Sequence, residues 1–264
     1  MFRKKIKFVV GLTTFNNEFL EISVSGLARI RDKFTLVVYN DNPDTTVTKK
    51  QIRKLGYRGK LYVKNGDKNL GQLGARLALL EFIKAQRVKA DWIMFADDDD
   101  ILLNLKFPRV SDNNFAVIQN MVVLRTRLLD VLRVMKAPNN YQIDKENIAL
   151  VRPHVGLAGT WVKADILFQL GDMLKSVEDK IQVVSDSLLF RAPIDIMMWS
   201  ALNIFARAKN PDASPIYMDN INYIAIDLDT AKTKYGRAVQ PSKNAVSQIE
   251  RAIAQYDAII RAQM

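Results

Sequence analysis

The chain has 264 residues, of which 48% are apolar, and this is enough for one large α/β domain with a substantial core. Because it contains no cysteine, disulfide frameworks, thiolate zinc sites and cysteine nucleophiles are excluded. Lysine and arginine number 39 against 28 aspartates and glutamates, which gives a formal net charge of +11. This surplus indicates a polyanionic partner, such as nucleic acid, an anionic membrane surface or nucleotide phosphates. A basic surface that only keeps the protein soluble is the alternative interpretation.

Apolar runs in the sequence stay short. None approaches the ~20 residues that span a membrane, and residues 1–12 are too short and too polar for a secretion signal. We interpret residues 1–12 as a basic arm that enters the first strand. Together with the lack of cysteine, this predicts a soluble or at most peripheral protein of the cytoplasm, or of the host cytoplasm if a phage encodes it.

The first hundred residues alternate short apolar runs with amphipathic stretches, which predicts strands separated by helices. The expected strands are 6–12, 34–39, 61–63 and 92–96, and the expected helices are 18–31, 48–55 and 72–85. Such an alternation forms a parallel sheet, which binds its ligands beyond the carboxyl ends of the strands. The polar loops at those ends should therefore share one rim. They span 13–17, 40–46, 64–71 and 97–100.

The second half of the chain has a less regular pattern. Expected elements are a strand at 115–120, a helix or strand at 126–135, a polar loop at 138–147, and helices at 163–173, 193–207 and 243–262. Pro193 fits the first turn of its helix. Neither an internal repeat nor an interdomain linker is evident, so we expect a single domain.

Four consecutive aspartates, Asp97 to Asp100, follow the apolar run 92–96 and precede the apolar residues 101–103, so they stand where a buried strand ends. Two carboxylates ~4 Å apart repel each other by about 4 kcal/mol at an effective dielectric constant of roughly 20. A run of four beside the core therefore indicates a bound counter-cation. Oxygen ligands without nearby Cys or His favour Mg²⁺ or Mn²⁺, which also bind substrate phosphates. A polar strand end with helix-capping aspartates is the alternative interpretation.

Five short motifs follow the predicted strands and loops in chain order. They are VVGLTTFNN at 9–17, VVYNDNPDT at 37–45, NLG followed by AR at 69–76, FADDDD at 95–100 and PIDIMMW at 193–199. In this order they resemble the family 2 glycosyltransferases of GT-A fold, over roughly residues 6–207. The resemblance implies an α/β fold of GT-A type, with a mostly parallel central sheet flanked by helices. It divides the chain into a nucleotide-sugar-binding half (1–110), an acceptor-binding half (111–240) and a C-terminal helix (241–264).

In that family the first strand leads into a loop that grips the nucleotide, and the second strand ends in an acidic residue that contacts the base. The matching loop residues are Thr13, Thr14, Phe15 and Asn16. Asp41 is the matching acidic residue. The alternative interpretation is that Asx residues at this strand end, Asn40 or Asp44, only hold a turn.

The third loop and the helix after it resemble the family segment that lies against the donor diphosphate. Asn69 and Gly71 would let the donor approach the backbone, and Arg76 would face the diphosphate near a helix N-terminus, which favours anions. Alternatively, Gly71 and Gly74 only start a helix, and Arg76 lies on its solvated face.

The aspartate run resembles the Asp-x-Asp motif of the family. Asp99 would bind Mg²⁺ or Mn²⁺ between the donor phosphates, and Asp97 would bind the same metal, its water or the ribose. Asp98 would also contact the donor. Asp100 would contact these residues and would not itself contact the metal or the donor. With a UDP-sugar as donor, the metal would neutralise the diphosphate that leaves.

A late helix of the family carries the base that removes the proton from the acceptor hydroxyl. Asp195, in the segment 193–199, matches that residue, and Asp186 is the reserve candidate. A base opposite the leaving group gives one-step displacement with inversion. Alternatively, Asp195 is a helix-start carboxylate stabilised by the helix dipole. The only histidine, His154, precedes the acceptor-lining segment 156–161, and either a structural role or a metal or acceptor contact remains open.

The resemblance predicts a metal-dependent hexosyl- or pentosyltransferase that moves a sugar from a UDP-sugar to a hydroxyl group. The charge of +11 favours hydroxymethylated pyrimidine in phage-type DNA as the acceptor, because such an enzyme must reach a base inside a polyanion. The alternatives are an enzyme that builds lipopolysaccharide or another surface glycan at a membrane face, a nucleotidyltransferase, and a silent nucleic-acid-binding protein.

Overall fold

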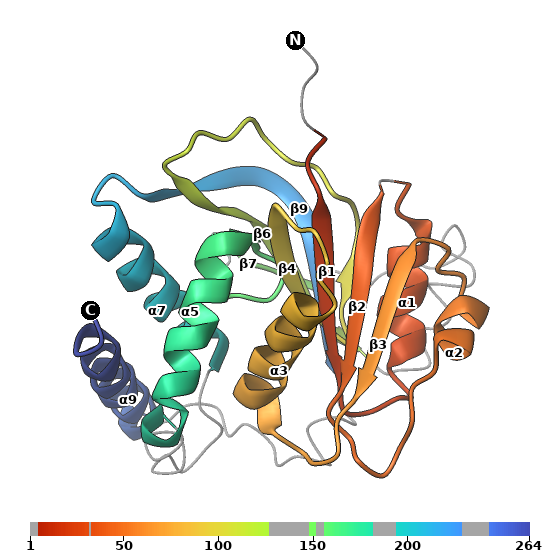
Figure 1. Cartoon of the computed structure of the whole chain (residues 1–264), viewed down its shortest axis with the longest axis horizontal. Coiled ribbons are helices and arrows are strands. Elements are labelled where there is room, and N and C mark those ends of the chain that lie inside the picture. Colours follow the sequence, from red (N-terminus) through yellow and green to blue (C-terminus); the bar gives the residue numbers. More distant parts are fainter. Residues whose placement is uncertain (1–4, 32, 127–147, 152–155, 182–193, 229–242) are drawn as a thin grey trace.

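One mixed sheet runs through the protein, and helices cover both of its faces (Figure 1). The structure is a computed structural model that describes residues 5–31, 33–126, 148–151, 156–181, 194–228 and 243–264. Its strands are β1 (Phe8–Thr14), β2 (Phe34–Asn40), β3 (Lys60–Asn65), β4 (Trp92–Asp97), β5 (Ile101–Leu102), β6 (Asn114–Thr126), β7 (Ile148–Val151), β8 (Trp161–Lys163) and β9 (Ser214–Leu228). Its helices are α1 (Leu20–Arg29), α2 (Lys49–Lys54), α3 (Gly71–Ala85), α5 (Ala164–Ser176), α7 (Ile194–Lys209) and α9 (Lys243–Arg261). Within these residues the strand order is β3-β2-β1-β4-β8-β6-β9-β5, and β7 pairs with β6.

The strands β3, β2, β1 and β4 form the parallel part of the sheet, as the sequence predicts. Strands β1, β2 and β4 are buried along nearly their whole length, which explains their continuous apolar runs. At their carboxyl ends Thr13 pairs with Tyr39 on one side and with Asp97 on the other, and Tyr39 pairs with Lys64. The four polar loops therefore begin at one edge, and the predicted common rim is confirmed.

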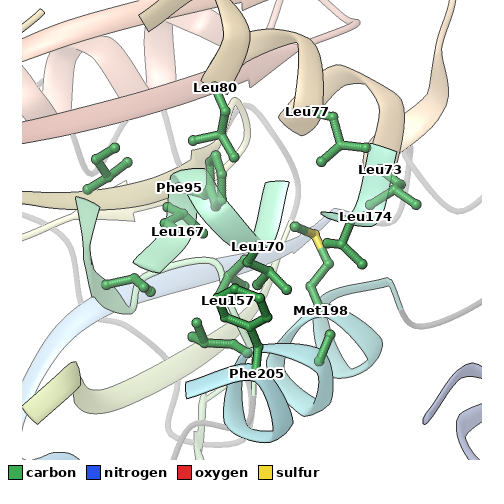
Figure 2. Close-up of a cluster of buried hydrophobic side chains, with 14 of the residues drawn as sticks. Leu73, Leu77, Leu80, Phe95, Leu157, Leu167, Leu170, Leu174, Met198 and Phe205 are labelled. Carbon is green, nitrogen blue, oxygen red and sulfur yellow. The ribbon is translucent and has the colours of Figure 1, made fainter. Parts of the chain in front are cut away.

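Two hydrophobic clusters fill the space between the sheet and its helices. On one face, Val9 and Phe95 join apolar side chains of α3, α5 and α7, and Figure 2 shows this cluster around Phe95. On the other face, Val10 and Val38 join apolar side chains of α1 and α2. Successive residues of a strand point to opposite faces, so Val9 and Val10 belong to different clusters. This two-sided packing fixes the carboxyl edge of β1 and β4, where the polar loops start.

The predicted C-terminal helix is present as α9, which packs against α7. Tyr256 and Ile260 are fully buried in the same cluster as α7, and Ser200 of α7 donates a hydrogen bond to Asp257 at 2.7 Å. The predicted α/β class, with a central sheet flanked by helices, is confirmed. In the described part of the chain, no helix combines the length and the apolar character that crossing a membrane requires.

The second half of the sheet differs from what the sequence predicts. Strand β9 was not expected, yet it pairs in parallel with β6 along nearly the whole of both strands. The short strand β8 joins β4 to β6 and is antiparallel to both, so the sheet is parallel in its first half and mixed in its second. Residues 127–147, which contain the expected loop 138–147 and most of the expected element 126–135, lie outside the described residues.

Candidate active site

Asp98 connects the aspartate run to the loop after β1 through hydrogen bonds. Its Oδ2 accepts hydrogen bonds from Thr14 Oγ1 at 2.6 Å and from the backbone N–H groups of Phe15 and Asn16 at 3.2 and 3.3 Å. Burial raises the pKa of Asp98 to about 6, although these hydrogen bonds act in the opposite direction. The loop predicted to grip the nucleotide and the predicted acidic motif are therefore one connected unit.

Asp41 joins the end of β2 to the start of α3. Its Oδ1 accepts the N–H of Leu70 at 2.9 Å, and its Oδ2 accepts the N–H of Gly71 at 3.0 Å. Its own N–H donates to the carbonyl oxygen of Thr14 at 2.7 Å. Burial raises the pKa of Asp41 above its usual value, while the two hydrogen bonds that it accepts lower it. Asp41 thus caps α3 from another element, since the N-cap residue Leu70 makes no side-chain cap bond of its own.

Gly71 begins α3 and has open space beside its Cα. Its φ of +69° lies in the left-handed region, and a Cβ added there would meet nothing within 4 Å. Asn69 Oδ1 accepts its N–H at 2.9 Å, beside the bond to Asp41. The predicted donor contacts Asn69 and Gly71 therefore lie at an exposed helix N-terminus on the rim, where an anion is favoured.

Asp100 turns away from the rim towards β9. It is buried, and its Oδ1 accepts the N–H of Ile226 at 3.0 Å. Burial raises the pKa of Asp100 well above its usual value, with the charges of Asp99 and Asp97 as further causes. The hydroxyl of Tyr223, hydrogen-bonded to Asp100, also accepts the N–H of Asp97 at 3.2 Å. Asp100 and Tyr223 together fix the end of β4 against β9.

Arg76 lies fully buried between two carboxylates from different parts of the fold. Its Nη2 donates to Asp97 Oδ1 at 3.1 Å, and its Nη1 donates to Asp195 Oδ1. Its guanidinium also lies 5.5 Å from the ring of Phe95. Burial disfavours the charged guanidinium, but Asp195 and Asp97 outweigh it and raise the pKa of Arg76. The alternative interpretation that Arg76 lies on a solvated helix face is wrong.

Asp97 and Asp195 thereby belong to one charged cluster, although they lie 98 positions apart in the sequence. Burial raises the pKa of Asp97, Asp195 raises it further by repulsion, and Arg76 lowers it. The N–H of Ala158 donates to Asp195 Oδ1 at 3.2 Å, and Gln72 Nε2 donates to Asp195 Oδ2 at 3.3 Å. The predicted base thus lies beside the predicted metal motif.

Three of the four aspartates of the run have partners elsewhere in the protein. Asp97 pairs with Arg76, Asp98 holds the β1 loop and Asp100 holds β9, so the side chains diverge. The bound cation that the aspartate run indicated therefore stays a prediction. The described residues contain no group of three or more His, Cys, Asp or Glu side chains arranged to hold a metal.

Several contacts at this site were not predicted from sequence. Gln72 and Ala158 reach Asp195, and Tyr223 reaches Asp97 and Asp100. Gln72 begins the expected helix, but no sequence signal connects it with Asp195. The candidates Asp186 and His154 lie outside the described residues.

Comparison with known proteins gives one family and several distant structures. The family described as glycosyl transferase family 2 matches residues 9–112. A search of curated proteins finds no match. Staphylococcus aureus TarS 1–349 in complex with UDP-GlcNAc is 15% identical, with 98% of this chain and 71% of that chain covered and a TM-score of 0.47. Against the longer TarS chain, at 15% identity and a TM-score of 0.45, this chain covers only 39% of the length.

Two further structures lie at similar distances. GalNAc-T7 with UDP, GalNAc and Mn²⁺ is 11% identical, with 96% of this chain and 48% of that chain covered and a TM-score of 0.49. A nucleoside-diphosphate-sugar pyrophosphorylase from Vibrio cholerae is 13% identical, with 87% of this chain and 99% of that chain covered and a TM-score of 0.48.

The family match spans the whole parallel part of the sheet. It includes the β1 loop, Asp41, Arg76 and the aspartate run, which are the residues that meet at the rim. Over residues 9–112, the chain is therefore similar to the glycosyl transferase family 2.

Proposed function

We propose that the protein transfers a sugar from a nucleotide sugar, with UDP-sugars as the first donors to test, to an acceptor hydroxyl. The observation that carries this proposal is the meeting of Asp97 and Asp195 on Arg76. Asp97 ends a strand of the family 2 segment, and Asp195 comes from α7, outside that segment. Asp97, which we assign to the donor and its metal, and Asp195, which we assign to the acceptor proton, therefore contact the same guanidinium.

The donor would bind along the rim between the β1 loop and the start of α3. Thr13, Thr14, Phe15 and Asn16 would hold the nucleotide, and Asn69 and Gly71 would lie beside its diphosphate. Asp41 remains our candidate for the base contact, although both of its oxygens also accept N–H groups of α3. Exposed backbone at a helix N-terminus supports the placement of phosphates there.

The residues of the rim fit a hard divalent cation. Asp97 keeps 27% of its side chain exposed, Asp99 is half-buried, and both offer only oxygen. Mg²⁺ usually binds one or two protein carboxylates and completes its coordination with substrate phosphates. Asp99 and Asp97 would hold Mg²⁺ or Mn²⁺, which when bound would neutralise charge on the leaving diphosphate.

Asp195 would act as the base. Its side chain is 29% exposed, so an acceptor hydroxyl can reach it. Removal of the hydroxyl proton lets the acceptor oxygen attack the anomeric carbon while the bond to the diphosphate breaks. This one-step displacement inverts the configuration of that carbon.

Exposed basic side chains support a polyanionic acceptor. They lie along α2 and β3, at one edge of the sheet, and include Lys49, Lys50, Lys54, Lys60 and Lys64. This edge continues into the third loop of the rim, so a chain of phosphates could bind there and reach the donor. Hydroxymethylated DNA is therefore our first acceptor to test, and a lipid-linked or surface glycan at a membrane face is the second.

The decisive experiment incubates the protein with UDP-, GDP-, dTDP- and CMP-sugars, with Mn²⁺, Mg²⁺ or EDTA. We expect release of UDP from one UDP-sugar, and mass spectrometry of hydroxymethylated DNA should show the added sugar. Release of pyrophosphate from a nucleoside triphosphate and a sugar phosphate would instead indicate nucleotidyl transfer. If no nucleotide sugar is bound or consumed, the proposed function is wrong.

A further inference from the structure

Arg76 is not placed to contact the donor diphosphate. Its side chain has 0% exposed surface, and its two terminal nitrogens already bind Asp97 and Asp195. Resting on the proposed function, we infer that Arg76 is a positioning residue, which holds the base Asp195 in place for the acceptor. To contact a diphosphate, Arg76 would have to leave two carboxylates that balance its charge in the protein interior, at a large cost.

The guanidinium joins three elements that the sequence separates. Arg76 comes from α3, Asp97 from β4 and Asp195 from the first turn of α7. A planar guanidinium offers several N–H groups in a fixed geometry, so it can bind two carboxylates at a defined angle. Arg76 therefore links the first turn of α7 directly to the end of β4.

The contacts of Asp195 assign different roles to its two oxygens. Oδ1 accepts the inward bonds, from Arg76 and from the N–H of Ala158 at 3.2 Å. Oδ2 accepts the longer bond from Gln72, at 3.3 Å, and Gln72 is exposed. Oδ2 is thus the oxygen that takes the proton when the acceptor oxygen bonds to the anomeric carbon. The electrons of the broken glycosyl–phosphate bond leave with the nucleoside diphosphate.

Arg76 therefore orients Asp195, while Asp97 shares the positive charge of the same guanidinium.

The test is a double-mutant cycle in which donor binding and turnover are measured separately. The variants are Arg76→Met, Asp195→Asn and the double variant, with kcat and the KM for the UDP-sugar measured for each, and with UDP binding measured by calorimetry. We expect Arg76→Met to lower kcat about 100-fold while KM and UDP affinity stay within about threefold, because the residue acts through the base. In the Asp195→Asn background, the same change should cost less than about threefold.

Two further variants test whether the geometry of Arg76, and not only its positive charge, is required. Arg76→Lys retains a cation that reaches only one carboxylate, so we expect kcat at least about 10-fold below wild type in a protein with the wild-type circular dichroism spectrum. Lys84→Met is the matched control, because it removes a cation from the exposed side of the same helix, where Lys84 pairs with Asp172. It should leave kcat within about twofold. If Arg76→Met does not fold, the cycle is run with Arg76→Lys.

The inference is wrong if the losses from Arg76→Met and Asp195→Asn multiply, since independent losses mean that Arg76 does not act through Asp195. It is also wrong if UDP affinity falls more than about 10-fold in Arg76→Met, or if Arg76→Lys retains wild-type kcat. Failure of the proposed function gives a different result, because wild-type protein would then neither bind UDP nor transfer sugar.

Discussion

Asp41 caps Gly71 across the rim, since its Oδ2 accepts the backbone N–H of Gly71 at 3.0 Å. The bond joins the end of β2 to the first turn of α3, and a second bond, from Leu70 to Oδ1, makes the junction bidentate. The N-cap residue Leu70 has no polar side chain, so Asp41 supplies the cap together with Asn69, whose Oδ1 also accepts the N–H of Gly71. The start of α3 at Gly71 is therefore held partly by tertiary structure.

The burial of Asp41 predicts a pH-dependent stability. Its raised pKa means that the folded protein binds the proton more tightly than the unfolded chain does. Its contribution to stability is therefore fully present below about pH 4, the usual aspartate pKa, and is lost as the pH rises through the raised value. We expect the free energy of unfolding of wild type, minus that of Asp41→Asn, to fall as the pH rises above about 4. Urea unfolding of both proteins from pH 3 to 8 measures this difference, and a flat or rising difference would contradict it.

Two glycines with positive φ should differ sharply in their tolerance of alanine. Gly159 has a φ of +76°, and a Cβ there would lie 2.8 Å from the ring of Tyr223, whereas Gly71, at +69°, has open space. We expect Gly159→Ala to lower the free energy of unfolding by about 2–4 kcal/mol, from backbone strain plus overpacking. Gly71→Ala carries the strain alone and should cost about 1 kcal/mol. Urea unfolding followed by circular dichroism compares them, and equal losses would refute the role of Tyr223.

The parallel part of the sheet could be predicted because its strands are buried on both faces. A run such as 92–96, five apolar residues that end at Asp97, has no other favourable place in an α/β protein. Strand β9 shows neither a continuous run nor a clean alternation, since Pro215, Asp219 and Asn222 interrupt it. Its identity as a strand depends on pairing with β6, and that partner lies about a hundred residues earlier.

The residues of the candidate site could be found in the sequence more readily than the contacts between them. Arg76, Asp97 and Asp195 each stand in a motif that the sequence reveals, but nothing local indicates that they touch. The bond from Arg76 to Asp195 spans 119 residues, so it depends on where α7 docks against the sheet. The prediction that Arg76 faces a diphosphate came from the family resemblance and from its place near a helix N-terminus, and neither indicates its buried partners.

Asp98 is expected to hold the β1 loop as a hydrogen-bond acceptor, and its negative charge should matter less for this role. Three groups, Thr14 Oγ1 and the N–H groups of Phe15 and Asn16, donate to one of its oxygens, and an asparagine carbonyl oxygen can accept all three. Asp98→Asn should therefore stay within about 1 kcal/mol of wild-type stability at pH 7, whereas Asp98→Ala should lose about 2 kcal/mol. Thermal unfolding measures both. Calorimetry with UDP should find weaker binding only for the alanine variant, and equal behaviour of the two variants would show that the β1 loop does not depend on Asp98.

Asp99 is expected to carry the dependence on a divalent metal. It follows β4 at the rim, half-buried, beside Asp97, whose charge is already shared with Arg76. Replacing it by asparagine removes the stronger ligand, so we expect Asp99→Asn to lose at least about 100-fold in kcat with Mn²⁺, while its unfolding temperature changes little. Asp112→Asn is the control, because it makes the same change at an exposed position after the rim. Paramagnetic relaxation of water by Mn²⁺, measured with UDP present, reports binding without turnover. A variant that still binds Mn²⁺ and retains wild-type kcat would show that the metal, if one is used, is held by other residues.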